Sequence, residues 1–551
     1  MSTITALPTA PQRSDTANFA VRMDAWVQQF TTLTTTEVNT VAGEVNANAA
    51  TATAQAAAAA VQAALATAQA TAAANSATTA ASVVGVSVWA SGTYARYSAA
   101  ISPADGLTYR KIGATGTSSI DPKYDTVNWV GLNGVGIAAS YPSIRPVLQL
   151  DFANSRFVDS RIAVTRASGA TYTTPAGLQA TAGNNVLRVD YDPATLACSG
   201  ALLEPASTNL LLWSNKISNA AWSKGGTTVT ANATLALDGT LTADKLVEDT
   251  STGLHVLYQG STSAVASTPY TATIKAKAGE RYNLQINLDD GSSSGLAVSA
   301  DLSNGTINTP ASYGTASGAT ASISLPDSNG DYKITLSGTP LTSGVAVRLV
   351  AYLKNNSNAQ SYTGDGTSGL HILSAQIEPG LVSTSDIPTT TTALTRAADV
   401  ALLSGSNFTS WFNPVEFSAV CSFVISPLAQ ASFICFSDGT TGNYVCIASS
   451  GTSLSVLVYS GSSLSANLSL GSVTAGSLCK VALACKANDF SASLNGATCI
   501  TDTSGAMPVG LSRLNIGSGV FSDNPPASAI AGVWGYSKRL SNANLQALST
   551  I

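Results

Sequence analysis

The sequence predicts a mainly β protein, in which an N-terminal helix and an alanine-rich coiled coil precede a small β module and tandem β-sandwich (jelly-roll) domains. Three observations support this prediction. Only 10% of the 551 residues are charged, against roughly 25% in an average chain. Residues 36–82 are dominated by alanine, the strongest helix former. Much of the remainder alternates apolar and polar residues between turns, as in "DYKITLSGTP", which is typical of half-buried strands.

Residues 1–35 combine a proline-punctuated lead with a short amphipathic helix. Ser14 or Asp15 can cap this helix. Such a segment is typical of a docking element, although an ordinary terminal helix would show the same pattern. The apolar side chains recur at helical spacing, and the docking candidates among them are Phe19, Met23, Trp26 and Phe30.

Residues 36–82 carry a heptad, marked by Gln55, Gln62 and Gln69. The glutamines would lie beside a coiled-coil seam, and the alternative is disorder. Three valines form a second apolar run out of phase with this seam, so a break in register is expected near residues 46–52. The stretch lacks the roughly 20 apolar residues of a membrane helix. The expected seam residues are Ala54, Ala58, Val61, Leu65, Ala68 and Ala72, and the valines are Val38, Val41 and Val45.

Residues 83–135 form an aromatic-rich segment that predicts a small β module. Its aromatic order, with "GLTY" and "NWV", resembles the carbohydrate-binding modules of bacterial chitinases. That resemblance implies sugar contacts, because aromatic faces stack on the C–H surfaces of sugars. The alternative is that the same rings form the core. The residues concerned are Trp89, Tyr94, Tyr97, Tyr109 and Trp129.

The remaining chain divides into three β segments. Residues 136–205 are expected to be a β connector, residues 206–400 a β-sandwich, and residues 401–551 a jelly roll that ends in a short helix at "SNANLQALS". Two phrases recur at the segment edges: "LLEPASTNL" and "QIEPGLVST", and "VTRAS" and "LTRAAD". We expect them to mark domain boundaries.

Six of the seven cysteines lie in the last quarter of the chain. A disulfide framework is one interpretation. The stretch "LCKVALACK" instead places Cys479 and Cys485 on the apolar face of a strand, and Cys421 shares a face with two phenylalanines. We therefore expect buried thiols, which a reducing cytoplasm would preserve.

Residues able to perform catalysis or bind a metal are sparse. The two histidines lie far apart in sequence, and Asp289 and Asp290 face opposite ways on an extended strand or belong to a turn. Asp327, Asn329 and Asp331 begin like a calcium loop, but the usual glycine and distal glutamate are missing. We expect no enzyme, no cofactor and no metal, and a β-turn at "DSNGDY".

Loops of the C-terminal jelly roll are the candidates for binding a partner, since binding residues concentrate on loops. Plain hairpin turns are the alternative. The net charge of −5 provides no basic footprint, so no nucleic acid partner is expected. No secretory signal is visible at the N-terminus. The loop candidates are Asp438, Asn443, Tyr444, Phe521, Asp523 and Asn524.

Four stretches together resemble tail fibres of tailed bacteriophages. They are "ITALPTAPQRSDTANFAVRMDAW", "LQLDFANSRF" through "LLEPASTNLLLWS", "AQIEPGLVSTSDIPTTTTALTRAADV", and residues 401–551, which resemble concanavalin A-like, laminin G-like jelly rolls. The resemblance implies an elongated homotrimer in the virion tail, folded in the host cytoplasm before assembly. Its N-terminus would join the tail, baseplate or an adaptor protein, and its distal β domains would bind a host surface glycan or protein. The alternatives are a structural tail or collar component that positions a separate receptor-binding protein, and a glycan-cleaving tailspike.

Overall fold

The computed structural model describes most of the chain in two compact units, Met1–Gly136 and Ile137–Ile551. The chain is mainly β, as predicted, with its strands arranged in several sheets. In the described part, no helix is long and apolar enough to cross a membrane. The described residues are 16, 18–83, 89–96, 98–104, 108–125, 127–131, 145–155, 158–261, 264–341, 346–425, 430–520 and 525–551.

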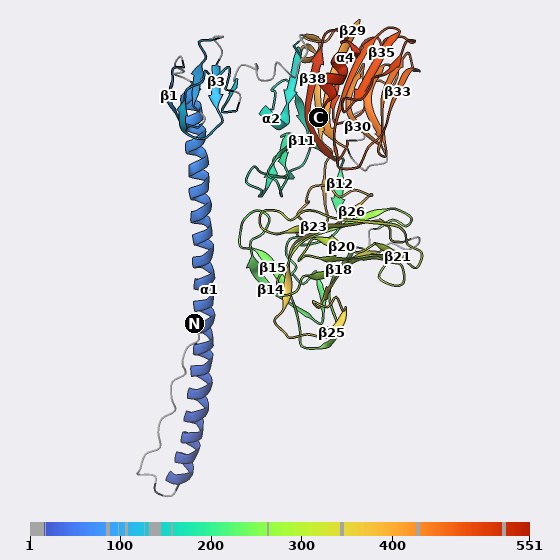
Figure 1. Cartoon of the computed structure of the whole chain (residues 1–551). Helices are drawn as coiled ribbons and strands as arrows, with labels where there is room; N and C mark the ends of the chain where they lie inside the picture. The colour runs from blue at the N-terminus through green and yellow to red at the C-terminus, as the bar shows by residue number, and fades with distance from the viewer. Residues whose placement is uncertain are drawn as a thin grey trace. The chain divides into compact units, whose positions relative to one another are not determined.

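The first unit begins with one helix, α1 (Phe19–Val83), of 65 residues. The predicted short helix and alanine-rich rod are therefore a single element, uninterrupted at residues 35–36 and at 46–52 (Figure 1). Thr31, Thr32 and Thr53 each donate a hydroxyl hydrogen bond of 2.9 Å to the carbonyl four residues earlier, which keeps these β-branched residues compatible with the helix. At 1.5 Å per residue, α1 is about 100 Å long.

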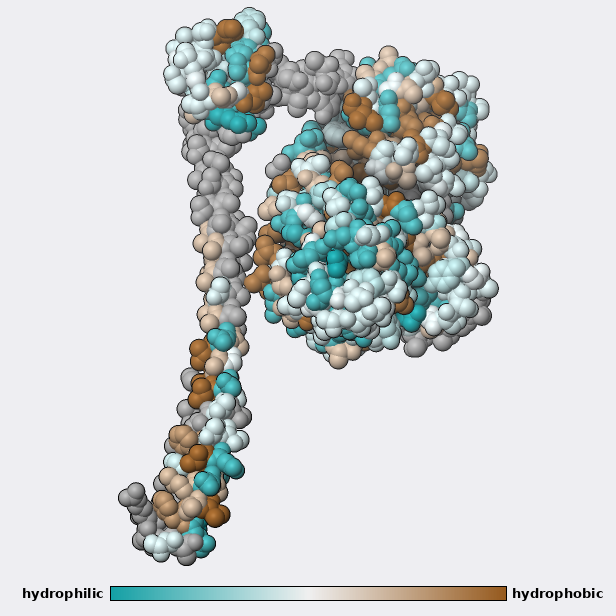
Figure 2. Space-filling model, turned by 60° about the horizontal axis from the view of Figure 1, so that its bottom comes forward, coloured by the Kyte–Doolittle hydropathy of each residue, from teal (hydrophilic) through white to brown (hydrophobic). Residues whose placement is uncertain are grey.

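Apolar side chains of α1 lie open along its N-terminal half. Val21 is 72% exposed and Val38 is 58% exposed, and Figure 2 shows hydrophobic residues along this part of the helix. Isolated helices obtain little stability from propensity alone, and most helical stability in proteins comes from packing an apolar face. A helix of this length with such a surface therefore favours association with further helices.

The continuity of α1 joins the docking candidates to the predicted seam. Phe19, Met23, Trp26 and Phe30 precede positions 54, 58, 61 and 65 by 35 residues each, which is five heptads. They therefore occupy the same heptad positions as the seam, and no net shift in register separates the two ends. In this phase Val38 and Val45 fall at b positions and Val41 at e. The a/d positions next to them are Glu37, Thr40 and Glu44, so the break expected near residues 46–52 stays a prediction. The coiled coil itself stays a prediction.

The rest of the first unit is a small β module, as expected for residues 83–135. Its core consists of Ala100, Tyr109 and Trp129, with Trp89 and Tyr94 packed against it. The strands form a pair, β1 (Gly92–Tyr94) with β4 (Gly116–Ser118), and a three-stranded sheet, β2 (Ala99–Ile101), β3 (Thr108–Lys111) and β5 (Trp129–Gly131).

The second unit contains a C-terminal sandwich of two sheets around a core rich in phenylalanine. Short helices α2 (Phe152–Ser155), α3 (Ser406–Thr409) and α4 (Asn542–Ser549) accompany it, and Ser541 caps α4 as the sequence predicted. The first sheet has the order β10 (Arg188–Tyr191), β11 (Cys198–Leu203), β38 (Ser528–Tyr536), β29 (Glu416–Val424), β34 (Leu478–Lys486), β35 (Asp489–Leu494) and β36 (Ile500–Asp502), with β6 (Leu148–Asp151) also paired to β38. The second has the order β33 (Ser463–Ser472), β32 (Ser453–Ser460), β31 (Tyr444–Ser450), β30 (Gln430–Ser437), β37 (Arg513–Ile516), β28 (Val400–Ser404) and β7 (Ala163–Thr165).

Residues 136–205, predicted as a connector, instead supply strands to both sheets of this sandwich. β6 and β11 pair with β38, and β7 pairs with β28. These pairs join residues more than 200 positions apart, and a single sequence carries no signal for such pairing. Among the described strands of this segment, the hairpin β8 (Ala170–Thr173) and β9 (Gln179–Ala182) stands outside the two sheets.

The strands between residues 206 and 400 form a second sandwich around its own core of leucine, isoleucine and alanine. In β23, Tyr332, Ile334 and Leu336 are buried in alternation, as the sequence pattern indicated. One sheet has the order β13 (Ser223–Gly225), β16 (Thr252–Ser261), β24 (Val347–Lys354), β18 (Asn283–Asp289), β19 (Gly295–Asp301) and β20 (Thr306–Ile307), with β21 (Ala311–Tyr313) and β25 (Ser361–Thr363) at its edges. The other has the order β14 (Thr227–Thr234), β15 (Ala243–Glu248), β26 (Gly369–Pro379), β17 (Tyr270–Lys277), β23 (Tyr332–Thr339) and β22 (Ser317–Ile323).

The second sandwich is an insertion within the first. The chain leaves the C-terminal sandwich after β11 through β12 (Ser207–Asn209) and returns through β27 (Leu394–Arg396), and these two strands pair with each other. Figure 1 shows β12 between the two sandwiches. The junction therefore contains the residues on either side of this two-stranded ribbon.

The cysteines are free thiols, as expected. Five of the seven are buried, and Cys198 and Cys499 are half-buried. Burial raises the pKa of Cys421 and of Cys485, so these thiols stay protonated and unreactive.

Candidate functional site

The aromatic residues predicted to contact sugar lie mainly in the core of the β module. Trp129 is 2% exposed, and its indole N–H donates to Ser118 Oγ at 3.1 Å. Tyr94 packs edge-on against Trp129 with 5.0 Å between ring centroids, and its hydroxyl bonds to the backbone of Ala90. Tyr109 is also buried. The alternative that these rings form a core therefore holds for Tyr109 and Trp129, whose faces are not open to a ligand.

Two further sugar-contact candidates have different outcomes. Trp89 is half-buried against the same core, as is Tyr94, so each ring is partly exposed. Tyr97 lies outside the described residues. A sugar site on Trp89 and Tyr94 stays a prediction.

The candidate loop at residues 438–444 is a hydrogen-bonded turn. Asp438 Oδ1 accepts from the amide of Thr440 at 2.7 Å, and Asp438 Oδ2 accepts from Asn443 Nδ2 at 2.9 Å. Tyr444 stacks on Tyr459 with 4.7 Å between centroids. These side chains stabilise the hairpin, and a role in receptor contact stays a prediction. Phe521, Asp523 and Asn524 lie outside the described residues.

The docking candidates lie on one face of α1. Phe19, Met23 and Trp26 are half-buried, and the rings of Trp26 and Phe30 stack with 5.4 Å between centroids. Their helical spacing is compatible with docking to another protein and equally with the seam of a coiled coil.

The carboxylates considered for calcium form a turn. Asp327 Oδ1 accepts from the amides of Asn329 at 2.8 Å and Asp331 at 3.0 Å. Burial, and then the charge of Asp327, raise the pKa of Asp331 to about 7. Among the described residues, no three or more histidine, cysteine, aspartate or glutamate side chains gather as metal ligands do.

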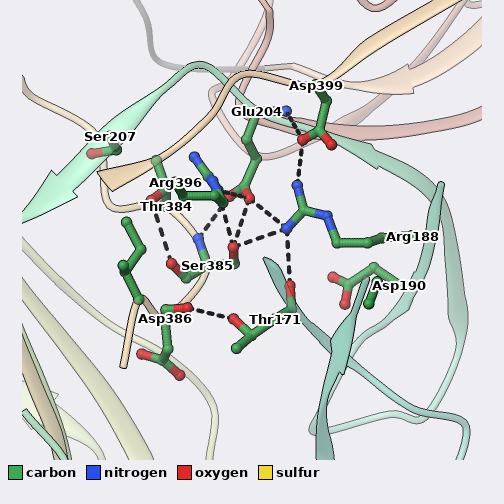
Figure 3. A network of polar contacts seen from close by, with 12 residues as sticks. Thr171, Arg188, Asp190, Glu204, Ser207, Thr384, Ser385, Asp386, Arg396 and Asp399 are labelled. Carbon is green, nitrogen blue, oxygen red and sulfur yellow. Dashed lines mark hydrogen bonds and ion pairs between the residues drawn. The ribbon is translucent and has the colours of Figure 1, made fainter. Parts of the chain in front are cut away.

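A polar site that no local sequence pattern indicates lies at the junction of the two sandwiches. Three of the recurring phrases meet there and, together with Arg188 of β10, supply a buried ion network of Arg166, Arg188, Glu204, Arg396 and Asp399, most of which Figure 3 shows. We call this set the junction network. Its side chains are no more than 3% exposed. The recurrence of the phrases indicates domain boundaries, but a single sequence carries no signal for their contact across the inserted sandwich.

Each charge of the junction network has an opposite partner. Arg166 Nη1 lies 2.7 Å from Asp399, and Arg188 bridges Asp399 and Glu204, the latter at 2.8 Å. Arg396 forms an ion pair with Glu204 from the other side. Burial opposes the charge of Glu204, but Arg396 and Arg188 outweigh it and lower its pKa to about 2. Buried charges persist only when paired and hydrogen-bonded in this way.

Ser385 extends the junction network toward a cavity. Its amide and hydroxyl each donate to Glu204 at 2.7 Å, and the next residue, Asp386, accepts from Lys275 Nζ at 2.5 Å. Figure 3 shows the carboxylate of Asp386 directed away from Glu204. The loop at residues 383–386 therefore separates the network from a second polar cluster.

That second cluster lines a cavity of about 800 Å³, which we call the junction cavity. Its walls come from the β8–β9 hairpin, from β17 and β23, and from the 383–386 loop. The lining is rich in hydroxyl, amide and charged groups, and a volume of this size lies in the range of small-molecule sites. The polar lining includes Thr173, Gln179, Asp190, Lys275, Ser324, Lys333, Ser383, Ser385 and Asp386.

Titratable groups of the junction cavity are perturbed. Burial, and more weakly the charge of Glu204, raise the pKa of Asp190, whose carboxylate accepts from the amide of Thr173 at 2.7 Å. Burial and the charge of Lys275 lower the pKa of Lys333. Perturbed groups in a cavity mark a candidate functional site. The arrangement can bind a polar ligand.

Comparisons with known proteins identify no family. No protein-family model matches the sequence, and neither does any curated protein. Among solved structures, the CBM40 domain of Ruminococcus gnavus IT-sialidase bound to α2,6-sialyllactose is 19% identical, with 25% of this chain and 84% of that chain covered at a TM-score of 0.23. Domains LG4–5 of the mouse laminin α1 chain are 10% identical, with 54% and 88% covered at a TM-score of 0.18. The tandem CBM22 domains of Paenibacillus barcinonensis Xyn10C are 9% identical, with 60% and 98% covered at a TM-score of 0.20. These neighbours are laminin G and carbohydrate-binding domains. At TM-scores this low, the similarity assigns neither a fold family nor a function to this chain.

Proposed function

We propose that this chain is the subunit of a homotrimeric tail fibre of a tailed bacteriophage, which joins the tail through its N-terminus and binds a host surface glycan through its β domains. The observation that carries the proposal is α1, a 65-residue helix with exposed apolar side chains, in which residues 19–30 and the predicted seam at residues 54–72 share one heptad phase. Such a helix gains its stability by packing against copies of itself.

The motifs that resemble phage fibres also support the proposal. Glu204, Arg396 and Asp399 belong to those motifs and form the junction network. The free thiols fit folding in a reducing cytoplasm before assembly into a virion. Three linked copies would turn a weak glycan contact into firm attachment, because linked sites bind with a high effective concentration.

Adsorption measurements test this function. Purified full-length protein, added to host cells before the phage, is expected to reduce adsorption in proportion to its concentration. A protein that folds and assembles but leaves adsorption unchanged contradicts receptor binding and favours the structural tail or collar component. Incubation with host polysaccharide is expected to release no reducing ends, whereas their release would indicate a glycan-cleaving tailspike.

A further inference from the structure

Two lysines face each other across neighbouring strands in the junction cavity. Lys275 on β17 pairs directly with Lys333 on β23 in the antiparallel register. Their neighbours Ile274, Ala276 and Ile334 are buried in the sandwich core, so both lysines lie on the opposite, cavity-facing side of the sheet. Like charges directly opposite in a sheet are destabilising.

The carboxylate of Asp386 balances the positive charge of only one of these two lysines. Asp386 binds Lys275 at 2.5 Å and also accepts from Gln179. Among the residues that the structure describes, the ammonium of Lys333 makes no ion pair or hydrogen bond. Burial, and then the charge of Lys275, lower the pKa of Lys333, while the charges of Asp386, Glu378 and Glu204 act in the opposite direction.

The other carboxylates of the junction cavity are already engaged. Glu204 is held by two arginines of the junction network. Asp192 accepts from the amides at positions 194 and 195, within its own turn. Asp190 accepts from the amide of Thr173, and burial raises its pKa. Among the described residues, Lys333 is therefore a cation of the cavity with no carboxylate in ion-pair contact.

We propose that the junction cavity binds an acidic saccharide whose carboxylate pairs with Lys333. The hydroxyl and amide groups around Lys333, among them Gln179, Ser324 and Ser383, match the hydroxyls of a sugar ring. A volume of about 800 Å³ accommodates one or two sugar rings, far more than a small inorganic anion. This inference goes beyond the proposed function, since it stands whether or not the chain is a fibre subunit.

Calorimetric titration of the full-length protein tests the proposal. The probes are sodium glucuronate and N-acetylneuraminate as acidic sugars, glucose as a neutral sugar, and sodium sulfate as a simple anion. At least one acidic sugar is expected to bind saturably, and glucose and sulfate at least about tenfold more weakly. The Lys333→Gln variant is expected to lose about tenfold or more in affinity, as the loss of one charge-assisted hydrogen bond implies.

The exposed Lys216, on the same sandwich, provides the matched control, and Lys216→Gln is expected to bind as the wild type does. Lys333→Gln is expected to unfold at the same temperature or higher, because it removes repulsion from Lys275. Absence of saturable binding by both acidic sugars overturns the proposal, as does unchanged affinity in Lys333→Gln. Sulfate binding as tight as either sugar overturns the saccharide assignment. If acidic sugars bind but the protein does not block phage adsorption, the cavity assignment stands and the fibre function fails.

Discussion

Arg396 and Glu204 form a buried ion pair across the base of the inserted sandwich, although 192 residues separate them in the chain. Glu204 ends the segment that leads into the insertion, and Arg396 lies in β27, the strand that leads out of it. The pair therefore links the chain segment that enters the inserted sandwich to the segment that leaves it.

The Arg396→Met substitution is expected to destabilise the second unit by about 3–5 kcal/mol, because removing one partner leaves a buried charge poorly compensated. The double variant Arg396→Met with Glu204→Leu is expected to recover part of that loss. Lys486→Met is the control, since Lys486 forms a 3.9 Å pair at 53% exposure with Glu416 and should cost less than about 1 kcal/mol. Chemical denaturation measures all three. Equal effects for Arg396→Met and Lys486→Met would refute the role of the junction network.

Acid is expected to weaken the same network. The folded-state pKa of Glu204, about 2, is below the value of about 4.3 for an unfolded glutamate. A lowered pKa adds stability that is complete above the unfolded value and is lost as the pH falls toward 2. The difference in thermal midpoint between wild type and Glu204→Gln should therefore shrink between about pH 4.5 and pH 2. A difference that stays constant over this interval would contradict the pairing.

The heptad predicts which substitutions in α1 weaken assembly. Trp26→Ser removes a seam side chain from every chain, and burial of such a side chain is worth about 1.5–3 kcal/mol. The trimer is therefore expected to dissociate at a protein concentration at least about tenfold higher than the wild type does. Val21→Ser changes a 72% exposed residue off the seam and should leave assembly unchanged. Analytical ultracentrifugation compares them, and equal dissociation of the two variants would exclude the seam at residues 19–30.

The β module offers a test of core against sugar contact. Trp129→Ala is expected to destabilise the module by about 3–5 kcal/mol, the usual cost of removing a buried aromatic ring. Tyr124→Ala changes a 66% exposed ring and should alter stability by no more than about 0.5 kcal/mol. Limited proteolysis of the full chain measures the stability of the module as the rate of cleavage within residues 89–131. A Trp129→Ala protein that resists cleavage as the wild type does would refute the core role.

Local sequence patterns predict most of the helices and strands, but they do not predict which strands pair with one another. Alanine content predicted the helix, and the alternation around Ile334 predicted β23, because both depend on neighbouring residues. Strands in residues 136–205 join the C-terminal sandwich through pairs that local periodicity cannot encode, so the insertion was not foreseen. Lys275 and Lys333 illustrate the same limit at the candidate site. Lys333 belongs to the polar side of the predicted strand at "DYKITLSGTP", and only the register between β17 and β23 shows that it lies directly opposite Lys275.

The mass of the full-length protein in solution tests the central claim most directly. Light scattering at micromolar concentration is expected to give about 167 kDa, three times the 55.6 kDa of one chain. A stable species of 55.6 kDa would show that α1 persists without partner helices and would contradict the fibre.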